Sequence, residues 1–230
     1  MIRSAFSATV LSIALLLSVP AHANSGELMN FVGLGNLQAV GNFYNGGGLP
    51  NTPNYGVSFS SNFFGLKPES AGGDGNFSGT PLTCSSGQSC PIIFIDGTYG
   101  TLAKGVMNVA PGFSSGINFV FSAAFTGGQT ETVTLWSGAN GTGTVLATVT
   151  LANNDGSCSG TSYCNWSQVG LSFSGTARSV TFNGPADALG LTDITLGSSK
   201  TAVPEPSAIY LIVTGLGAIS FTRLRRFFGV

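Results

Sequence analysis

The amino-acid sequence predicts an all-β protein, folded as an antiparallel β-sandwich of the jelly-roll kind. Apolar and polar residues alternate over short segments of the body, and this period of two is typical of strands. Between these segments lie clusters of Gly, Asn, Ser and Pro, and the 230 residues include 34 glycines. The body lacks a long segment with the apolar spacing of an amphipathic helix. We therefore expect roughly eight to ten short strands in two packed sheets.

The first half of the body carries weaker strand signals than the second, because its apolar segments are short and separated by long loops. The elements expected here are an opening strand at 37–44, an irregular loop at 45–54, extended structure at 55–60, a single helical turn at 62–66, a loop-rich stretch at 67–90, and short strands at 92–95 and 105–109. This half is the part of the fold that the sequence defines least.

The second half alternates more regularly. An apolar phase over 117–125 predicts a half-buried antiparallel strand. Asn140–Gly141 is a strong hairpin signal, so a strand with Val133 and Leu135 on its core face should pair with a return strand at 144–151. Further strands are expected at 169–173, 180–182 and 191–196.

The N-terminal residues 1–23 have the pattern of a secretory signal peptide. Arg3 supplies the positive charge, residues 10–19 form a short apolar core, and Pro20–Ala23 ends in the small residues that signal peptidase prefers. Signal peptidase is therefore an expected processing enzyme, and the mature chain would begin at Asn24. An uncleaved membrane anchor is the alternative interpretation.

Removal of the signal peptide has a chemical consequence. His22 is the only histidine of the chain, and it lies within the removed segment. The mature protein would then have no imidazole, which excludes Ser-His-Asp triads, Cys-His pairs and histidine-ligated zinc or copper.

The C-terminal end divides into three parts. Residues 201–206 form an extended linker with a Pro-Glu-Pro motif, and 207–230 form a single transmembrane helix with a basic tail. The motif consists of Val203, Pro204, Glu205 and Pro206, and the basic stop consists of Arg223, Arg225 and Arg226. Arginines on this side predict that the C-terminus stays in the cytoplasm. An ordinary single-span anchor is the alternative.

The order of these three parts resembles the PEP-CTERM sorting signal, which exosortases process in Gram-negative bacteria that produce exopolysaccharide. The resemblance implies export across the inner membrane, transient anchoring by the helix, cleavage by an exosortase, and a final place at the cell surface or outside the cell. The same signal also carries an ice-binding label in some descriptions.

The body itself resembles the sandwich domain that often precedes this tail, over most of residues 38–199. The segments that carry the resemblance are Gly41–Gly47, Asn54–Ser60, Met107–Asn108, Trp136–Thr148 and Leu191–Ser198. It supports one sandwich domain spanning residues 24–200. The acidic pair usual in the last strand of that domain is here Thr192–Asp193.

The four cysteines form two matched units with five residues between each pair. An even cysteine count in an exported protein predicts disulfides. Three pairings are possible, and we favour the local one, Cys84 with Cys90 and Cys158 with Cys164. A four-cysteine metal site is disfavoured, because it requires closer spacing and a reducing compartment.

The low charge of the chain excludes a nucleic-acid partner. Charged residues make up only 7% of the sequence, and only four basic residues occur between Asn24 and Ala202. Such a body has no basic patch that could follow a phosphate backbone.

Several residues are candidates for binding. Asp193 could ligate a structural calcium, although a solvent-facing position shared with Leu191 and Thr195 is the alternative. Trp166, Tyr163 and Trp136 could stack on sugar rings, with sheet or loop packing as the alternative. Thr130, Thr132 and Thr134 form a ladder that could order water, or else a solvent face of high β-propensity.

These observations predict an exported cell-surface or matrix protein with a structural or binding role among exopolysaccharides. A lectin-like carbohydrate-binding module is the alternative, and an ice-binding protein or a glycan-active hydrolase is less favoured. No carboxylate pair with the spacing of a glycosidase can be identified, so we expect no enzyme activity. Calcium is the one cofactor considered.

Overall fold

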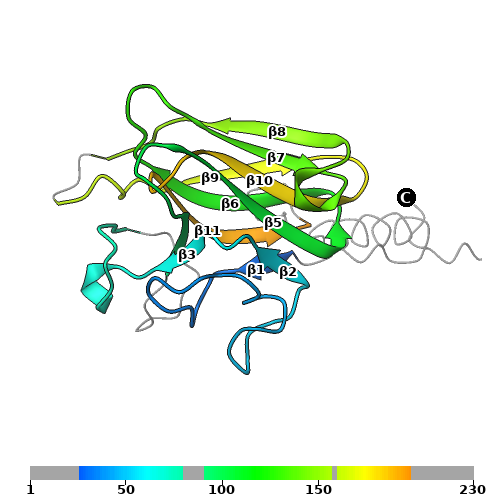
Figure 1. The fold of residues 1–230 in the computed structure, drawn as a ribbon, viewed down its shortest axis with the longest axis horizontal. Coiled ribbons are helices and arrows are strands. Elements are labelled where there is room, and N and C mark those ends of the chain that lie inside the picture. Colours follow the sequence, from blue (N-terminus) through cyan, green and yellow to red (C-terminus); the bar gives the residue numbers. More distant parts are fainter. Residues whose placement is uncertain (1–25, 80–90, 157–159, 198–230) are drawn as a thin grey trace, which may run out of the picture.

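The computed structural model describes residues 26–79, 91–156 and 160–197. Within these ranges the chain forms strands β1 to β11 and two short 3-10 helices, and every pairing between the strands is antiparallel (Figure 1). The all-β prediction is confirmed. The signal peptide, the Pro-Glu-Pro motif and the apolar tail lie outside the described residues. In the part of the chain that is described, no helix has the length and apolar character needed to cross a membrane.

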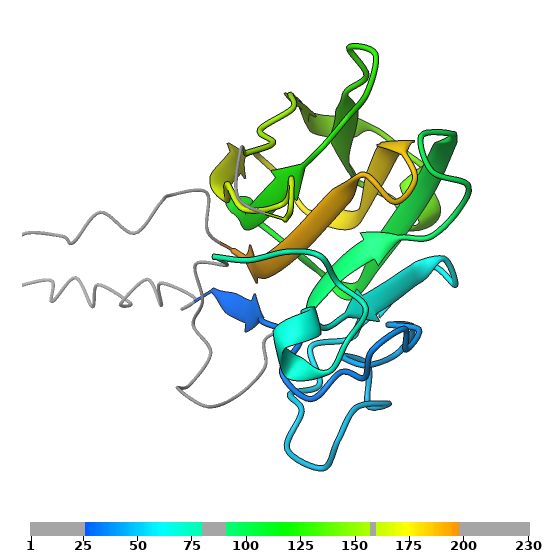
Figure 2. The same ribbon diagram turned by 90° about the vertical axis from the view of Figure 1, so that its left-hand side faces the viewer.

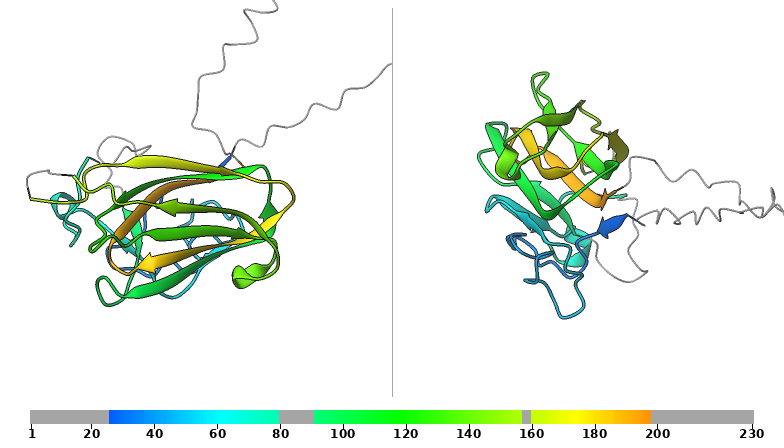
Figure 3. Two further views of the ribbon diagram at one scale, coloured as in Figure 1. Left: turned by 90° about the horizontal axis from the view of Figure 1, so that it is seen from above. Right: turned by 90° about the vertical axis from the view of Figure 1, so that its right-hand side faces the viewer.

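The strands form two sheets. Sheet A has the order β3 (Phe63–Leu66), β4 (Ile92–Ile95), β11 (Leu189–Leu196), β6 (Gly116–Ala123) and β9 (Ser167–Ser172), and β1 (Glu27–Met29) also pairs with β11. Sheet B has the order β2 (Val57–Phe59), β5 (Leu102–Phe113), β10 (Ala177–Pro185), β7 (Glu131–Trp136) and β8 (Val145–Leu151). The left view of Figure 3 shows the long strands running side by side.

The connectivity is that of a jelly roll. Taken from β4 to β11, the chain forms one row of β4-β11-β6-β9 and a second row of β5-β10-β7-β8. Late strands are thus inserted between early ones in both sheets, as in two nested Greek keys. Strands β1, β2 and β3 are additions at one end, where Figure 2 shows the N-terminal loops gathered.

The core lies between the sheets and is rich in aromatic rings. Phe182 packs edge-on against Phe63, with ring centroids 5.8 Å apart, and against Phe119 at 6.0 Å. All three side chains are fully buried. Gly105 makes this packing possible, because a Cβ there would come within 2.4 Å of the Phe63 ring. Residues from the weakly predicted first half are therefore essential to the core.

Three expectations about strands are wrong. Residues 37–44 form turns instead of a strand, because Leu37 and Gly41 have positive φ angles of 50° and 44°. The expected helical turn at 62–66 is strand β3, which pairs with β4. Strand β6 is buried along its whole length instead of on one face, and it lies inside sheet A between β11 and β9.

A β-bulge changes the faces of β11. The register with β6 shifts between Thr192 and Thr195, and Asp193 has a φ of 49°. The bulge lets Leu191 and Ile194 both be fully buried, although a regular strand would place them on opposite faces. The expected common face of Leu191, Asp193 and Thr195 is therefore wrong.

Candidate binding groove

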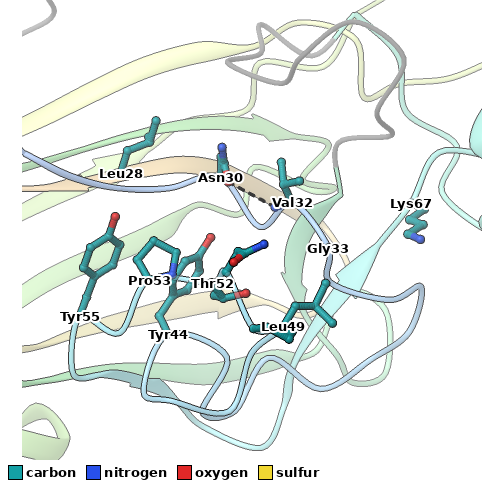
Figure 4. A pocket seen from close by; sticks show the side chains of 12 residues that line it. Leu28, Asn30, Val32, Gly33, Tyr44, Leu49, Thr52, Pro53, Tyr55 and Lys67 are labelled. Atoms are coloured by element: carbon teal, nitrogen blue, oxygen red, sulfur yellow. Dashed lines mark hydrogen bonds between the residues drawn. The ribbon is translucent and has the colours of Figure 1, made fainter.

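A groove of about 890 Å³ lies at the end of the sandwich formed by the N-terminal segment. Strand β1 and the residues after it form one wall, and the loop between Tyr44 and Tyr55 forms the other (Figure 4). Its lining residues are Leu28, Asn30, Val32, Gly33, Tyr44, Leu49, Pro50, Asn51, Thr52, Pro53, Tyr55 and Lys67. The volume falls in the range of sites for small ligands.

Local hydrogen bonds fix the loop wall. The Thr52 amide donates to the carbonyl of Leu49 at 2.8 Å, which closes a tight turn. The Gly56 amide donates to the side-chain oxygen of Asn54 at 3.1 Å, and the Tyr55 amide donates to the carbonyl of Tyr44 at 2.9 Å. The wall is therefore held by hydrogen bonds among its own residues, including the turn that Asn54 stabilises.

Tyr44 is the buried aromatic of the groove. Its side chain is 2% exposed, and its hydroxyl accepts a hydrogen bond from the Phe31 amide at 2.8 Å. Burial raises the pKa of Tyr44 well above its ordinary value, so the phenol stays neutral. Its ring stacks on Tyr55 with centroids 5.8 Å apart and an interplanar angle of 13°.

Polar groups are spaced along the groove. Asn30 is oriented by a hydrogen bond from the Val32 amide to its side-chain oxygen, at 3.3 Å. Asn51 and Thr52 supply an amide and a hydroxyl from the opposite loop, and Lys67 is the only charged side chain among the lining residues. Burial raises the pKa of Tyr55, with a further contribution from Glu27. The groove thus offers the ring of Tyr55, neutral hydrogen-bonding groups and one cation.

The groove narrows where the two walls approach each other. Gly33 has a φ of 92°, which favours glycine, and a Cβ there would lie 2.7 Å from Leu49. Leu49 is 55% exposed in spite of this contact. An exposed leucine at the rim provides apolar surface for a ligand.

None of the three aromatic candidates from the sequence lines the groove, and two of them, Trp166 and Tyr163, lie on the outer face of sheet A. Trp166 packs edge-on against Phe77, with centroids 6.1 Å apart, and its indole N–H donates to the carbonyl of Ser78 at 2.9 Å. The Tyr163 hydroxyl donates to the carbonyl of Asp187 at 3.0 Å. These contacts help to attach the segment around Phe77 to the sheet, and sugar binding by the two residues stays a prediction.

Trp136 lies on the outer face of sheet B and so does not join the other two. Its indole N–H donates to the Thr181 hydroxyl at 3.0 Å. The threonine ladder shares this face, but Thr134 is only 9% exposed, and the 3-10 turn Ala139–Gly141 packs over the neighbouring strand β10. Thr148 continues the row by a hydrogen bond to Thr134 at 3.3 Å.

The remaining candidates are Asp193 and the cysteines. Among the described residues, no group of three or more His, Cys, Asp or Glu side chains could hold a metal ion, and the calcium hypothesis stays a prediction. Cys164 is the one cysteine within those ranges, and it is disulfide-bonded. Cys84, Cys90 and Cys158 lie outside them, so the pairing also stays a prediction.

Sequence reasoning missed the groove because its residues are scattered between positions 28 and 67 and come mostly from turns. One signal was available. The loop rich in Asn, Gly and Pro over 45–54 is flanked by two tyrosines, Tyr44 and Tyr55. Polar loops bordered by aromatic residues are common at binding sites on rigid scaffolds.

Comparisons with known proteins find resemblance in folds alone. No family model and no curated protein matches the chain. The K2 cleaved adhesin domain of Lys-gingipain aligns with a TM-score of 0.41 and 13% identity, over 66% of this chain and 95% of that domain. A carbohydrate-binding module of Cellvibrio mixtus lichenase 5A, solved with cellotriose, aligns with a TM-score of 0.30 and 13% identity, over 60% and 96%. A xylan-binding domain aligns with a TM-score of 0.35 and 12% identity, over 64% and 90%.

Proposed function

We propose that this protein is a glycan-binding module of the bacterial surface or its exopolysaccharide matrix, and that the groove is its binding site. The observation that carries this proposal is a preformed groove of about 890 Å³ that combines the Tyr55 ring with neutral hydrogen-bonding side chains. Such a site binds by stacking and hydrogen bonding, with no bond made or broken.

The chemistry of the groove suits a sugar chain. The ring of Tyr55, backed by the buried ring of Tyr44, offers apolar surface for the C–H face of a pyranose, and the hydroxyl of Tyr55 adds a polar end. Asn30, Asn51 and Thr52 offer donors and acceptors for sugar hydroxyls. Lys67 would bind an acidic substituent on the same chain. A ligand with neutral sugars and occasional carboxylates therefore fits best.

Delivery to the surface is the second part of the proposal, and it rests on the sequence. The signal peptide would direct export, and an exosortase would cleave near the Pro-Glu-Pro motif. These steps bring the domain to the place where exopolysaccharide is found, and they are independent of which glycan binds.

Retention on the producer's own exopolysaccharide, or binding on a glycan array, tests the site. In the full chain we expect Tyr55→Ala to reduce affinity at least about tenfold while the melting temperature falls by only a few degrees. The matched control is Tyr99→Ala, because Tyr99 is 55% exposed and does not line the groove. Equal binding by both variants would remove the groove as the site.

Two further variants test the charge of the preferred glycan and the location of the binding site. Lys67→Ala should weaken binding to acidic glycans more than to neutral ones. Trp166→Ala tests the other aromatic face: if it abolishes binding while Tyr55→Ala leaves it intact, the site lies beside Phe77 and not in the groove. Absence of binding to every glycan would overturn the proposed function itself.

A further inference from the structure

The strands that end the two sheets differ in whether the chain covers their outer edges. Among the described residues, β2 and β3 end sheets B and A on one side, and β8 and β9 end them on the other. An edge strand carries unpaired N–H and C=O groups, which can pair with another chain unless they are covered. Whether an edge is covered or open therefore indicates where a second chain could pair with this one.

The chain covers its own β2 and β3 edges with the turn segment 37–44. Across β3, the Gly65 amide donates to the carbonyl of Gln38 at 2.8 Å, and the Leu37 amide donates to the carbonyl of Gly65 at 2.8 Å. Across β2, the Val57 amide donates to the carbonyl of Tyr44 at 3.2 Å. This segment therefore forms hydrogen bonds with backbone groups of β2 and β3 that would otherwise face solvent.

Strand β8 has no such cover. Within the described ranges no strand or isolated bridge pairs with its outer side, and Figure 1 places it at the end of the sandwich opposite β1, β2 and β3. In an antiparallel pair every second residue turns its N–H and C=O away from the partner. Several backbone groups of Val145–Leu151 therefore point outward from β7.

The sequence of β8 also lacks the usual safeguards against pairing. Its seven residues, Val-Leu-Ala-Thr-Val-Thr-Leu, include no charged residue and no proline. Val145 is 48% exposed. A register shift occurs only beside Val145, so the rest of the strand pairs regularly with β7. The sequence is rich in residues of high β-propensity, and such a bare edge favours strand addition.

We propose that β8 is a self-association surface, on which a second copy of this chain pairs its own β8 in antiparallel fashion. A two-fold axis at Thr148 overlaps all seven residues and places Val145 opposite Leu151 of the second copy. Two sheets B would become one continuous sheet, and the row of Thr181, Thr134 and Thr148 would run across the axis. The strand is equally free of charge in both copies, so nothing in its sequence opposes this match.

Sedimentation velocity of the full chain over a concentration series tests this interface. We expect a monomer–dimer equilibrium for the unmodified chain. Thr148→Lys and Thr148→Glu each place like charges opposite each other, and each should weaken dimerisation about fivefold or more. An equimolar mixture of the two variants should recover dimers, because opposite charges then meet across the axis.

The matched control is Thr132→Lys, which adds the same charge to the same face of sheet B on the inner strand β7 and should leave dimerisation unchanged. Melting followed by circular dichroism verifies that each variant folds, and Thr150→Lys is a second probe on β8. A chain that stays monomeric at every concentration, or Thr148 variants that associate as the unmodified chain does, would overturn the proposal. So would a loss of association only in Gln168→Lys, which would assign the contact to β9. Glycan binding is measured separately and does not depend on this result.

Discussion

At one end of the sandwich, the N-terminal segment covers the edges of β2 and β3, encloses a groove and buries a hydroxyl that has a hydrogen-bond partner. At the other end, β7 and β8 leave an edge open and bury a carboxyl that has none: Glu131 is fully buried, and neither of its oxygens has a partner among the described residues. The difference shows that the irregular N-terminal segment gives partners to the polar groups around it, whereas the regular strands leave an open edge on β8 and an unpaired carboxyl on β7.

The largest effect should come from removing the aromatic group that holds the covered end together. Tyr44 contacts Phe43, Phe31 and Tyr55, with ring centroids between 5.1 and 5.8 Å. Tyr44→Ala should lower the free energy of unfolding by about 3–5 kcal/mol, the usual cost of truncating a buried aromatic residue. Urea titration measures this quantity.

The matched change at the open end is Val145→Ala, which truncates a half-exposed side chain of β8. We expect it to change the free energy of unfolding by less than about 0.5 kcal/mol. Similar losses from the two truncations would show that the two ends contribute equally to stability. That result would contradict our expectation that the covered end contributes more.

The two ends of the sandwich could be predicted from the sequence to different degrees. Val133 and Leu135 alternate with threonines, so β7 and its hairpin partner follow from the period of two. The covered end was not predictable, because segment 37–44 looks extended while positive φ angles at Leu37 and Gly41 turn it into a cover. The bulge at Asp193 is equally invisible, since it depends on the register with β6.

The groove could not be derived from the sequence for the same reason. It depends on turns that bring Leu28 and Lys67 to one site. A periodic pattern of apolar residues does not reveal which residues far apart in the sequence will meet in this way. The buried carboxyl, in contrast, could have been found. Glu131 precedes Val133 by two residues and so shares its inward phase along β7.

The second prediction concerns the pH dependence that this carboxyl imposes. Burial raises the pKa of Glu131 from 4.5 to about 8 in the folded protein. The unfolded chain loses the proton near pH 4.5 and the folded chain only near pH 8. The unfolded state is therefore favoured progressively as pH rises between these values. We expect stability to be highest below pH 4.5, to fall by on the order of a few kcal/mol, and to level off above pH 8.

Urea titrations between pH 4 and 9 would measure this profile, and Glu131→Gln isolates the group responsible. Asp187, whose pKa is also raised by burial, remains in both proteins. The Glu131→Gln substitution should flatten the fall in stability between the two pKa values. If the profiles of the two proteins run parallel, the carboxyl does not titrate in this way.

A smaller loss than that of Tyr44→Ala should come from removing only the hydroxyl at the covered end. Tyr44→Phe keeps the ring and removes the acceptor of the Phe31 amide, which is then left buried without its partner. Phe31 has a φ of 58°, a conformation that a bulky residue adopts only when its surroundings hold it. We expect a loss of about 1–3 kcal/mol in unfolding free energy, together with faster hydrogen exchange at the Phe31 amide.

Tyr99→Phe is the control, because that exposed hydroxyl makes only a 3.3 Å hydrogen bond, and it should change stability by less than about 0.5 kcal/mol. An unchanged exchange rate at Phe31 would mean that the hydroxyl does not hold this turn, and that the covered end depends on ring packing alone.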